Sequence, residues 1–212
     1  MWFSGRRVYT ENEKLNFKEM NRKTFIHLAS GMLLKSNQLL VAERAEPEIV
    51  YFKDDGIIPN SRYPLLLYRN VFSERGNDGA VWIEQQFLSN NWSNSWRNGI
   101  FTFQHYHSIT HEALGIYSGE VTVLLGGEKG SKLQVKAGDI IVIPAGVGHK
   151  NLGDTNLGVV GAYPNGMPVD IMRGEAGERP GTDKNIAAVP FPGTDPLRGA
   201  GEGLRKIWKA KS

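Results

Sequence analysis

Residues 99–119 read GIFTFQHYHSITHEALGIYSG and contain three of the five histidines of the chain. His105 and His107 are separated by one residue, so on a β-strand both side chains project from the same face. Glu112 follows after four further residues. Two neighbouring imidazoles on one buried face lose hydration without compensation unless something coordinates them. We therefore expect this segment to supply metal ligands.

A second segment, residues 138–153, reads GDIIVIPAGVGHKNLG and carries His149 just after a proline–glycine turn. Such a turn fixes the loop that delivers the histidine. The chain has no cysteine, so the ligands would be imidazole and carboxylate groups, which suit Fe(II), Mn(II), Ni(II), Cu(II) or Zn(II). The sequence thus predicts one divalent transition metal, and its predicted ligands are His105, His107, Glu112 and His149.

His111 is an alternative to Glu112 as the ligand from the first segment. On an unbroken strand His111 would point the same way as His105 and His107, and Glu112 would point away. A turn or bulge at residues 108–110 would reverse this parity. We expect that reversal, with Glu112 as the ligand and His111 as an alternative ligand or a neighbour of the ligands.

The chain around these segments is typical of an all-β fold. Between residues 99 and 163, short alternating runs are separated by glycine-containing turns, as in a sandwich or small barrel. Residues 49–52 and 65–69 predict two earlier strands. Gly119, Gly138 and Gly146 stand where tight turns require positive φ.

Two elements are expected between the early strands and the barrel. Residues 79–90 predict a helix capped by Asp78, with Ala80, Ile83 and Phe87 at helical spacing on its buried face. Residues 91–98 are polar and predict a loop that carries Trp92 and Trp96. Those two residues, with Arg69, Arg97 and Tyr117, are available to shape a pocket.

Length and composition indicate one large domain or two small ones. The chain has 212 residues, 40% of them hydrophobic and 22% charged, which excludes wholesale disorder. We predict an N-terminal appendage at 1–45, a barrel at 46–170 and a Gly/Pro-rich C-terminal arm at 171–212 that packs on the barrel. The 25 glycines and 10 prolines favour strands, turns and such an irregular arm over helices.

Charge and hydropathy limit the classes of partner. Residues 1–45 hold eight Lys/Arg and four Asp/Glu, whereas the remainder holds 17 and 18. A near-neutral body argues against nucleic-acid binding, and no apolar run is long enough to span a membrane. We expect a cytoplasmic protein. The alternative is export in folded form, because Arg22-Lys23-Thr24-Phe25-Ile26 resembles a twin-arginine signal.

The two histidine segments together resemble the cupin motifs. The first motif fits Gly99-(5)-His105-Tyr106-His107-(4)-Glu112-(6)-Gly119, and the second fits Gly138-(5)-Pro144-Ala145-Gly146-(2)-His149. The closing Asn of the second motif is replaced by Gly153, with Asn151 nearby.

The wider chain is similar to the YjlB-like group of single-domain bacterial cupins over roughly residues 48–209. This resemblance implies a double-stranded β-helix, or jelly-roll barrel, with one or two flanking helices and the four metal ligands named above. It implies no particular reaction.

The expected function is that of a small-molecule metalloenzyme. Four ligands on a metal that prefers six leave two positions for water, O2 or substrate, as in an open catalytic site. We expect an oxidoreductase of the dioxygenase kind. The alternatives are a non-catalytic metal- or sugar-binding module and a metal-dependent isomerase or lyase. Because cupin barrels leave sheet edges to be covered, we also expect a homodimer.

Overall fold

The structure is a computed structural model that describes residues 46–209. The N-terminal appendage, with the signal-like residues 22–26, lies outside the described residues. Within the described part, no helix is long and apolar enough to cross a membrane. The elements are β1 (Glu48–Val50), β2 (Leu65–Tyr68), α3 (Gly76–Ser89), β3 (Trp92–Asn98), β4 (Glu112–Leu125), β5 (Ser131–Lys136), β6 (Ile140–Ile143), β7 (His149–Pro164), α4 (Gly181–Ala188) and α5 (Leu204–Lys209).

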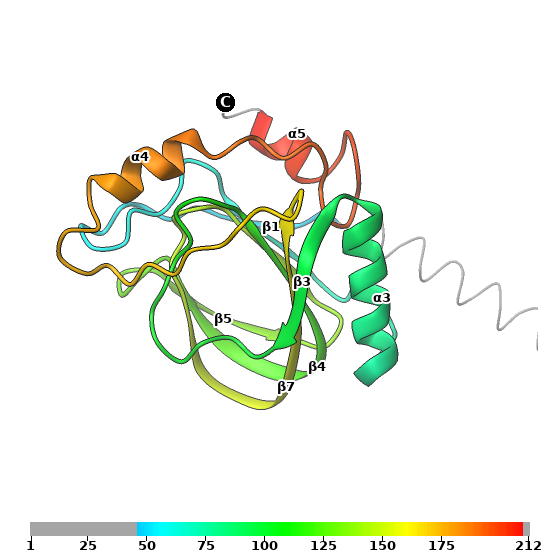
Figure 1. Ribbon diagram of the computed structural model, residues 1–212. Helices are drawn as coiled ribbons and strands as arrows, with labels where there is room; N and C mark the ends of the chain where they lie inside the picture. The colour runs from blue at the N-terminus through cyan, green and yellow to red at the C-terminus, as the bar shows by residue number, and fades with distance from the viewer. Residues whose placement is uncertain (1–45, 210–212) are drawn as a thin grey trace, which may run out of the picture. The chain divides into compact units, whose positions relative to one another are not determined.

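The strands form one antiparallel sheet that curls into a barrel, as the all-β prediction required (Figure 1). Its order is β1-β2-β6-β4-β7-β3, and β5 pairs with β4 beyond the end of β6. The long strands β4 and β7 pair from Ala113 opposite Ala162 to Leu125 opposite His149. The first residue of β7, His149, therefore lies opposite the last residue of β4.

Strands β2 and β6 are buried on both faces, and the two-residue period of the strands sorts their side chains between two hydrophobic clusters. In β2, Leu65 and Leu67 belong to the cluster inside the barrel, whereas Leu66 and Tyr68 belong to the outer cluster under the helices. In β6 the sequence Ile-Ile-Val-Ile divides in the same way. Continuous apolar runs are expected for strands buried on both faces.

Helix α3 begins earlier than predicted. It spans Gly76–Ser89, so Asp78 lies in its first turn and does not cap it. An acidic side chain in the first turn still interacts favourably with the positive end of the helix dipole. Ala80, Ile83 and Phe87 are buried, as predicted.

The prediction of a loop at residues 91–98 is wrong, because Trp92–Asn98 form strand β3. The strand pairs with β7, with Arg97 opposite Val160 and Asn98 opposite Val159. The register shifts between Ser93 and Trp96. Its polar composition reflects one exposed side, and backbone pairing to a distant strand overrides local propensity.

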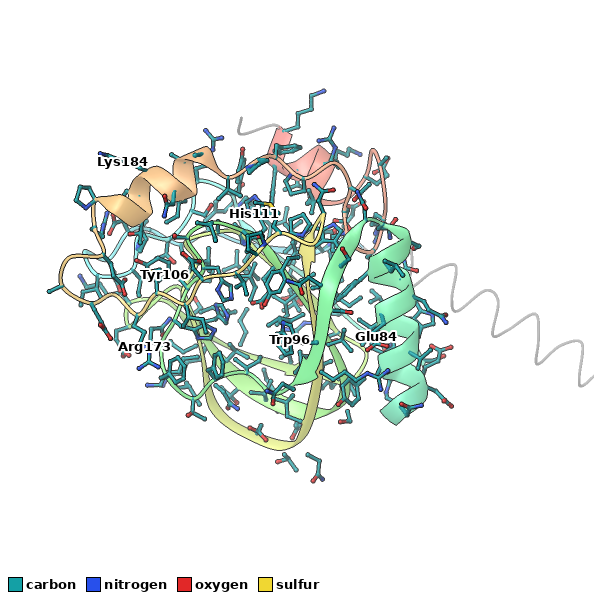
Figure 2. The ribbon with its side chains drawn as sticks, in the orientation of Figure 1. Glu84, Trp96, Tyr106, His111, Arg173 and Lys184 are labelled. Atoms are coloured by element: carbon teal, nitrogen blue, oxygen red, sulfur yellow. The ribbon has the colours of Figure 1, made fainter. Side chains whose placement is uncertain are left out.

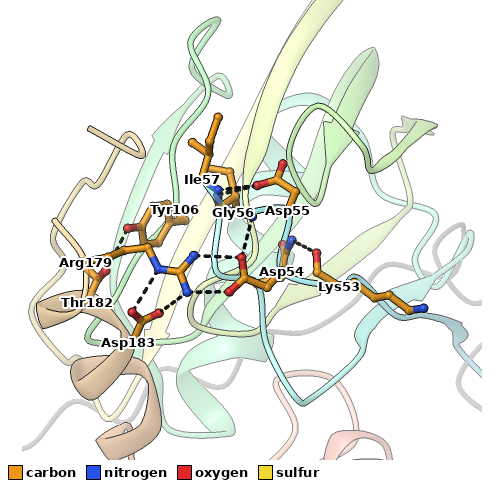
Figure 3. Close-up of polar contacts among 11 residues, drawn as sticks. Lys53, Asp54, Asp55, Gly56, Ile57, Tyr106, Arg179, Thr182 and Asp183 are labelled. Carbon is orange, nitrogen blue, oxygen red and sulfur yellow. Dashed lines mark hydrogen bonds and ion pairs between the residues drawn. The ribbon is translucent and has the colours of Figure 1, made fainter. Parts of the chain in front are cut away.

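The C-terminal arm contacts the barrel at several points. Figure 3 shows the Arg179 guanidinium between the carboxylates of Asp54 and Asp183. The Glu178 carboxylate accepts hydrogen bonds from the Tyr106 hydroxyl (2.9 Å) and from the amide of Gly174 (2.8 Å). These contacts tie the segment before α4 to the loop that precedes β2 and to the His-Tyr-His segment.

A buried carboxylate holds the end of the arm. Asp195 is 0% exposed and accepts the Tyr68 hydroxyl (2.6 Å) and the amide of Leu204 at the start of α5 (2.8 Å). Its other oxygen accepts the amides of Leu197 and Arg198. Burial, together with Asp195, raises the pKa of the Tyr68 phenol, so this hydroxyl stays a donor.

We predict that Asp195→Ala lowers the free energy of unfolding by about 2–4 kcal/mol, because it leaves several buried donors without an acceptor. Urea denaturation measures this change. Glu202→Ala is the control, since the exposed Glu202 forms only a 3.9 Å ion pair with Lys206. Equal effects of the two substitutions would show that Asp195 does not anchor the arm.

Candidate metal centre

Three histidines converge at the barrel interior. Candidate ligand atoms of His105, His107 and His149 all lie within 4.8 Å of one another, and each residue is at most 5% exposed. His105 and His149 face each other because their backbones exchange two hydrogen bonds, of 3.2 and 2.8 Å. The two histidine segments, distant in sequence, therefore meet in one cluster.

The outer nitrogen of each ring lies against a backbone carbonyl. Nδ1 of His105 lies 3.3 Å from the Phe103 oxygen, Nδ1 of His149 lies 3.2 Å from the Val147 oxygen, and Nδ1 of His107 lies against the Asp170 oxygen. A carbonyl only accepts, so these contacts place the proton on Nδ1. Each Nε2 is then left with the lone pair that a metal ion requires.

Glu112 joins the three histidines. Its Oε2 lies 3.5 Å from Nε2 of His107 and 3.3 Å from Nε2 of His149, and the residue is 2% exposed. Oε2 of Glu112 and Nε2 of His107 are buried without a hydrogen-bond partner. Buried polar atoms left in this way are costly, and a cation between them would satisfy both. The residues present therefore fit a metal ion.

The protonation states of Glu112 and His105 suit metal binding, whereas His107 holds a competing proton at low pH. Burial would raise the pKa of Glu112, but the adjacent imidazoles of His107 and His149 outweigh burial and hold it below its ordinary value. Burial and the neighbouring imidazoles lower the pKa of His105 to about 3. Burial lowers the pKa of His107 as well, but Glu112 outweighs it and the net shift is upward. An ionised carboxylate beside a neutral His105 is the state that a metal ion binds.

His111 lies apart from this cluster. Its Nδ1 accepts the amide of Ala145 (2.9 Å), and its ring lies 4.9 Å from that of Trp208 in α5. In Figure 2 it lies beside the C-terminal helices. The chain bends at residues 108–109, which reverses the strand parity as expected. The structure thus brings together His105, His107, Glu112 and His149 and places His111 against the outer cluster.

The four residues line one end of a cavity of about 270 Å³. Trp96 and Tyr163 also line it, and the Trp96 Nε1 donates a 2.8 Å hydrogen bond to the Tyr163 hydroxyl oxygen. Burial raises the pKa of Tyr163, and the negative charge of Glu112 raises it further. Tyr163 therefore remains protonated beside the Glu112 carboxylate.

Only two of the five residues considered for the pocket line it, namely Trp96 and Arg97. Trp92 is buried and donates to the Thr194 oxygen. Arg69 forms ion pairs with Glu48 and Asp139. Tyr117 packs against the outer cluster.

Sequence reasoning missed Asp170. Its carbonyl oxygen is the partner of His107, and its carboxylate accepts the amide (2.8 Å) and hydroxyl (2.5 Å) of Ser108. The neighbouring Met172 exchanges two 2.9 Å backbone hydrogen bonds with Tyr106. No local pattern marks these contacts, because they depend on the path of the chain after β7.

No family model matches the chain. Among solved structures, acireductone dioxygenase from Bacillus anthracis is 16% identical, with a TM-score of 0.31 over 40% of this chain and 58% of that chain. Oxalate decarboxylase of Bacillus subtilis is 20% identical, with a TM-score of 0.32 over 51% of this chain and 27% of that chain. Similarities this weak carry no argument about function.

The similarity to one relative is much stronger. The uncharacterized protein YjlB of Bacillus subtilis (strain 168) is 41% identical over 165 residues, which are 77% of this chain and 97% of that protein. The match therefore spans nearly the whole relative. With this identity, the antiparallel barrel and both histidine motifs in place, the chain belongs to the YjlB-like family of cupins.

Proposed function

We propose that the chain is a metal-dependent enzyme acting on a small molecule, an oxidoreductase of the dioxygenase kind. One divalent transition metal (Fe, Mn, Ni, Cu or Zn) would be held by His105, His107, Glu112 and His149. The observation that carries the proposal is the set of buried ligand atoms directed at one another at the inner end of a cavity. A structural metal would not need a cavity that leads to it.

The metal would supply Lewis acidity and open coordination positions for O2 or substrate oxygen atoms. The protein's own residues prepare the site for this role. Backbone carbonyls hold the Nδ1 protons of the three histidines, so each Nε2 is presented to the metal. Trp96 fixes the Tyr163 hydroxyl in the cavity that Glu112 also lines.

A non-catalytic sugar-binding module has less support. Sugar recognition needs several available hydrogen-bonding groups. Apart from the predicted ligands, the polar side chains that line this cavity are Trp96, Arg97, Asn98 and Tyr163, and Trp96 donates to Tyr163 while Arg97 is paired with Glu84. A metal-dependent isomerase or lyase would use the same ligands and open positions. Comparing turnover with and without O2 distinguishes the two, because only the dioxygenase requires O2.

We predict that His105→Ala combined with His107→Ala abolishes metal binding, because two of four ligands are lost. Elemental analysis after dialysis against each metal should give one ion per wild-type chain and none in the double variant. His111→Asn is the control: its amide oxygen can still accept the Ala145 amide, so it should bind metal as the wild type does. Equal metal content in wild type and double variant would refute the site.

We also predict that metal affinity rises with pH through the pKa of His107. In the metal-free protein this pKa is raised above 6.5, so at lower pH a proton occupies the group that must bind the metal. Below that pKa, metal affinity should fall about tenfold for each unit decrease in pH, for each proton that the metal must displace. Glu112→Gln removes the main cause of the upward shift, so the inflection should move to lower pH. Titrations between about pH 5.5 and 8 measure both curves, and an affinity independent of pH would contradict the assignment.

We propose in addition that two copies of the chain pair. Within the described residues, strand β1 lies at one end of the sheet path, and the apolar side chain of Ile49 in β1 is 47% exposed. Sheet ends with exposed apolar residues are commonly covered by a partner.

We predict that the wild type sediments as a dimer at micromolar concentration and that Ile49→Glu yields monomers. Leu88→Glu, at a 65% exposed residue of α3, should leave the dimer intact. Sedimentation velocity distinguishes these cases. A wild-type monomer would rule out the pairing.

A further inference from the structure

The cavity that ends at the four predicted ligands has an apolar outer wall. Phe101, Val169 and Ile171 line it and remain 42%, 39% and 47% exposed, so they form its mouth. Deeper in the cavity, Ile100 and Leu114 are buried. Apolar side chains gathered around a cavity mark a surface that binds an apolar group.

Charge at the cavity wall is neutralised. Arg97 is the one Lys or Arg among the residues that line this cavity. Its Nε and Nη2 donate to the two oxygens of Glu84 at 2.6 and 2.7 Å, and its Nη1 donates to Asn77 at 2.9 Å. A bidentate pair of this kind leaves little charge for a ligand. The wall therefore offers no free cation to a phosphate or a second carboxylate.

Size sets a further limit. The cavity volume of about 270 Å³ lies just below the range of about 300–1,000 Å³ that is usual for drug-sized ligands. A single ring or a short branched chain with a small head group matches this volume. Glu112 and the three histidines are the buried polar groups of the lining. At the exposed side the polar lining residues are Arg97, which is paired with Glu84, and Asn98, whose Oδ1 accepts the amide of Gly99 (2.9 Å).

We propose that this cavity binds a small ligand with two oxygen donors at one end and an uncharged, apolar body. The oxygen donors face the predicted metal, and the body packs against Phe101, Val169 and Ile171. The inference rests on the proposed metal centre and adds the class of substrate. Sugars, dicarboxylates and phosphate esters do not match the wall, because it offers them neither charge nor enough hydrogen-bonding groups.

Three hydroxamates share the same two-oxygen chelating group and differ in the rest of the ligand, so they test whether the cavity prefers an apolar body. With Zn(II)-loaded protein, benzohydroxamate should bind at least roughly tenfold more tightly than acetohydroxamate, because its phenyl ring is removed from water. 4-Carboxybenzohydroxamate should lose that advantage, because its charge would be placed against an apolar wall. Titration calorimetry gives the three affinities. Equal affinity for all three, or tightest binding of the carboxylate, would overturn the proposal.

Substitutions at the cavity mouth test whether the preference for benzohydroxamate depends on this apolar wall. Ile171→Ser should reduce the preference for benzohydroxamate over acetohydroxamate and leave the metal content unchanged. Ile171→Lys should reverse the preference in favour of 4-carboxybenzohydroxamate. Leu88→Ser is the matched control, because Leu88 is exposed on α3 and does not line the cavity. The same loss in Leu88→Ser, or no effect of Ile171→Lys, would count against the cavity as the binding surface.

Metal-free protein separates this inference from the proposed function. Benzamide, which has the ring without a chelating head, should give saturation-transfer signals with the metal-free wild type that Ile171→Lys abolishes. If no metal binds but this signal is present, the proposed function fails and the apolar site remains. If metal binds and neither benzamide nor the hydroxamate series shows a preference for the ring, the inference fails alone.

Discussion

The candidate site depends on two backbone hydrogen bonds between His105 and His149. They join a segment that precedes β4 to the first residue of β7, which lie 44 positions apart, and they bring the two imidazoles to a ring separation of 3.9 Å. Such a long-range contact carries a loop-closure cost, and the extensive pairing of β4 with β7 offsets it. The barrel thus brings two histidine-bearing segments, neither of which could form the site alone, into one candidate metal centre.

Burial gives these groups their chemistry. In water, an imidazole exchanges protons near neutrality and has no fixed tautomer. Inside the barrel, His105 stays neutral and the carbonyl of Phe103 determines which of its nitrogens carries the proton. Glu112 remains ionised because imidazoles surround it. The same enclosure that makes an unpaired carboxylate costly makes its affinity for a cation high.

Periodic features of the fold were predictable from the sequence, and contact-dependent features were not. A short apolar run bounded by turn residues identified β2, and short alternating runs identified the later barrel strands. The pair His105 and His107 defined a face without knowledge of the partner strand. Strand β3 was missed because its polar residues are explained only by pairing with β7. Asp170 was missed for a similar reason, since its partners His107 and Ser108 lie more than 60 residues earlier. Trp96 reaches Tyr163 by lying over Gly161, where any side chain would collide with its ring.

The C-terminal arm connects fold stability to the site. Asp170 stands immediately before this arm and orients His107, and the contacts of Glu178 with Tyr106 and of Arg179 with Asp54 follow within ten residues. The Arg179 ion pairs are partly exposed and contribute little by themselves. The buried Tyr68–Asp195 hydrogen bond is better protected from water and secures the far end. The orientation of one predicted ligand is therefore set by a segment attached to the barrel at both ends.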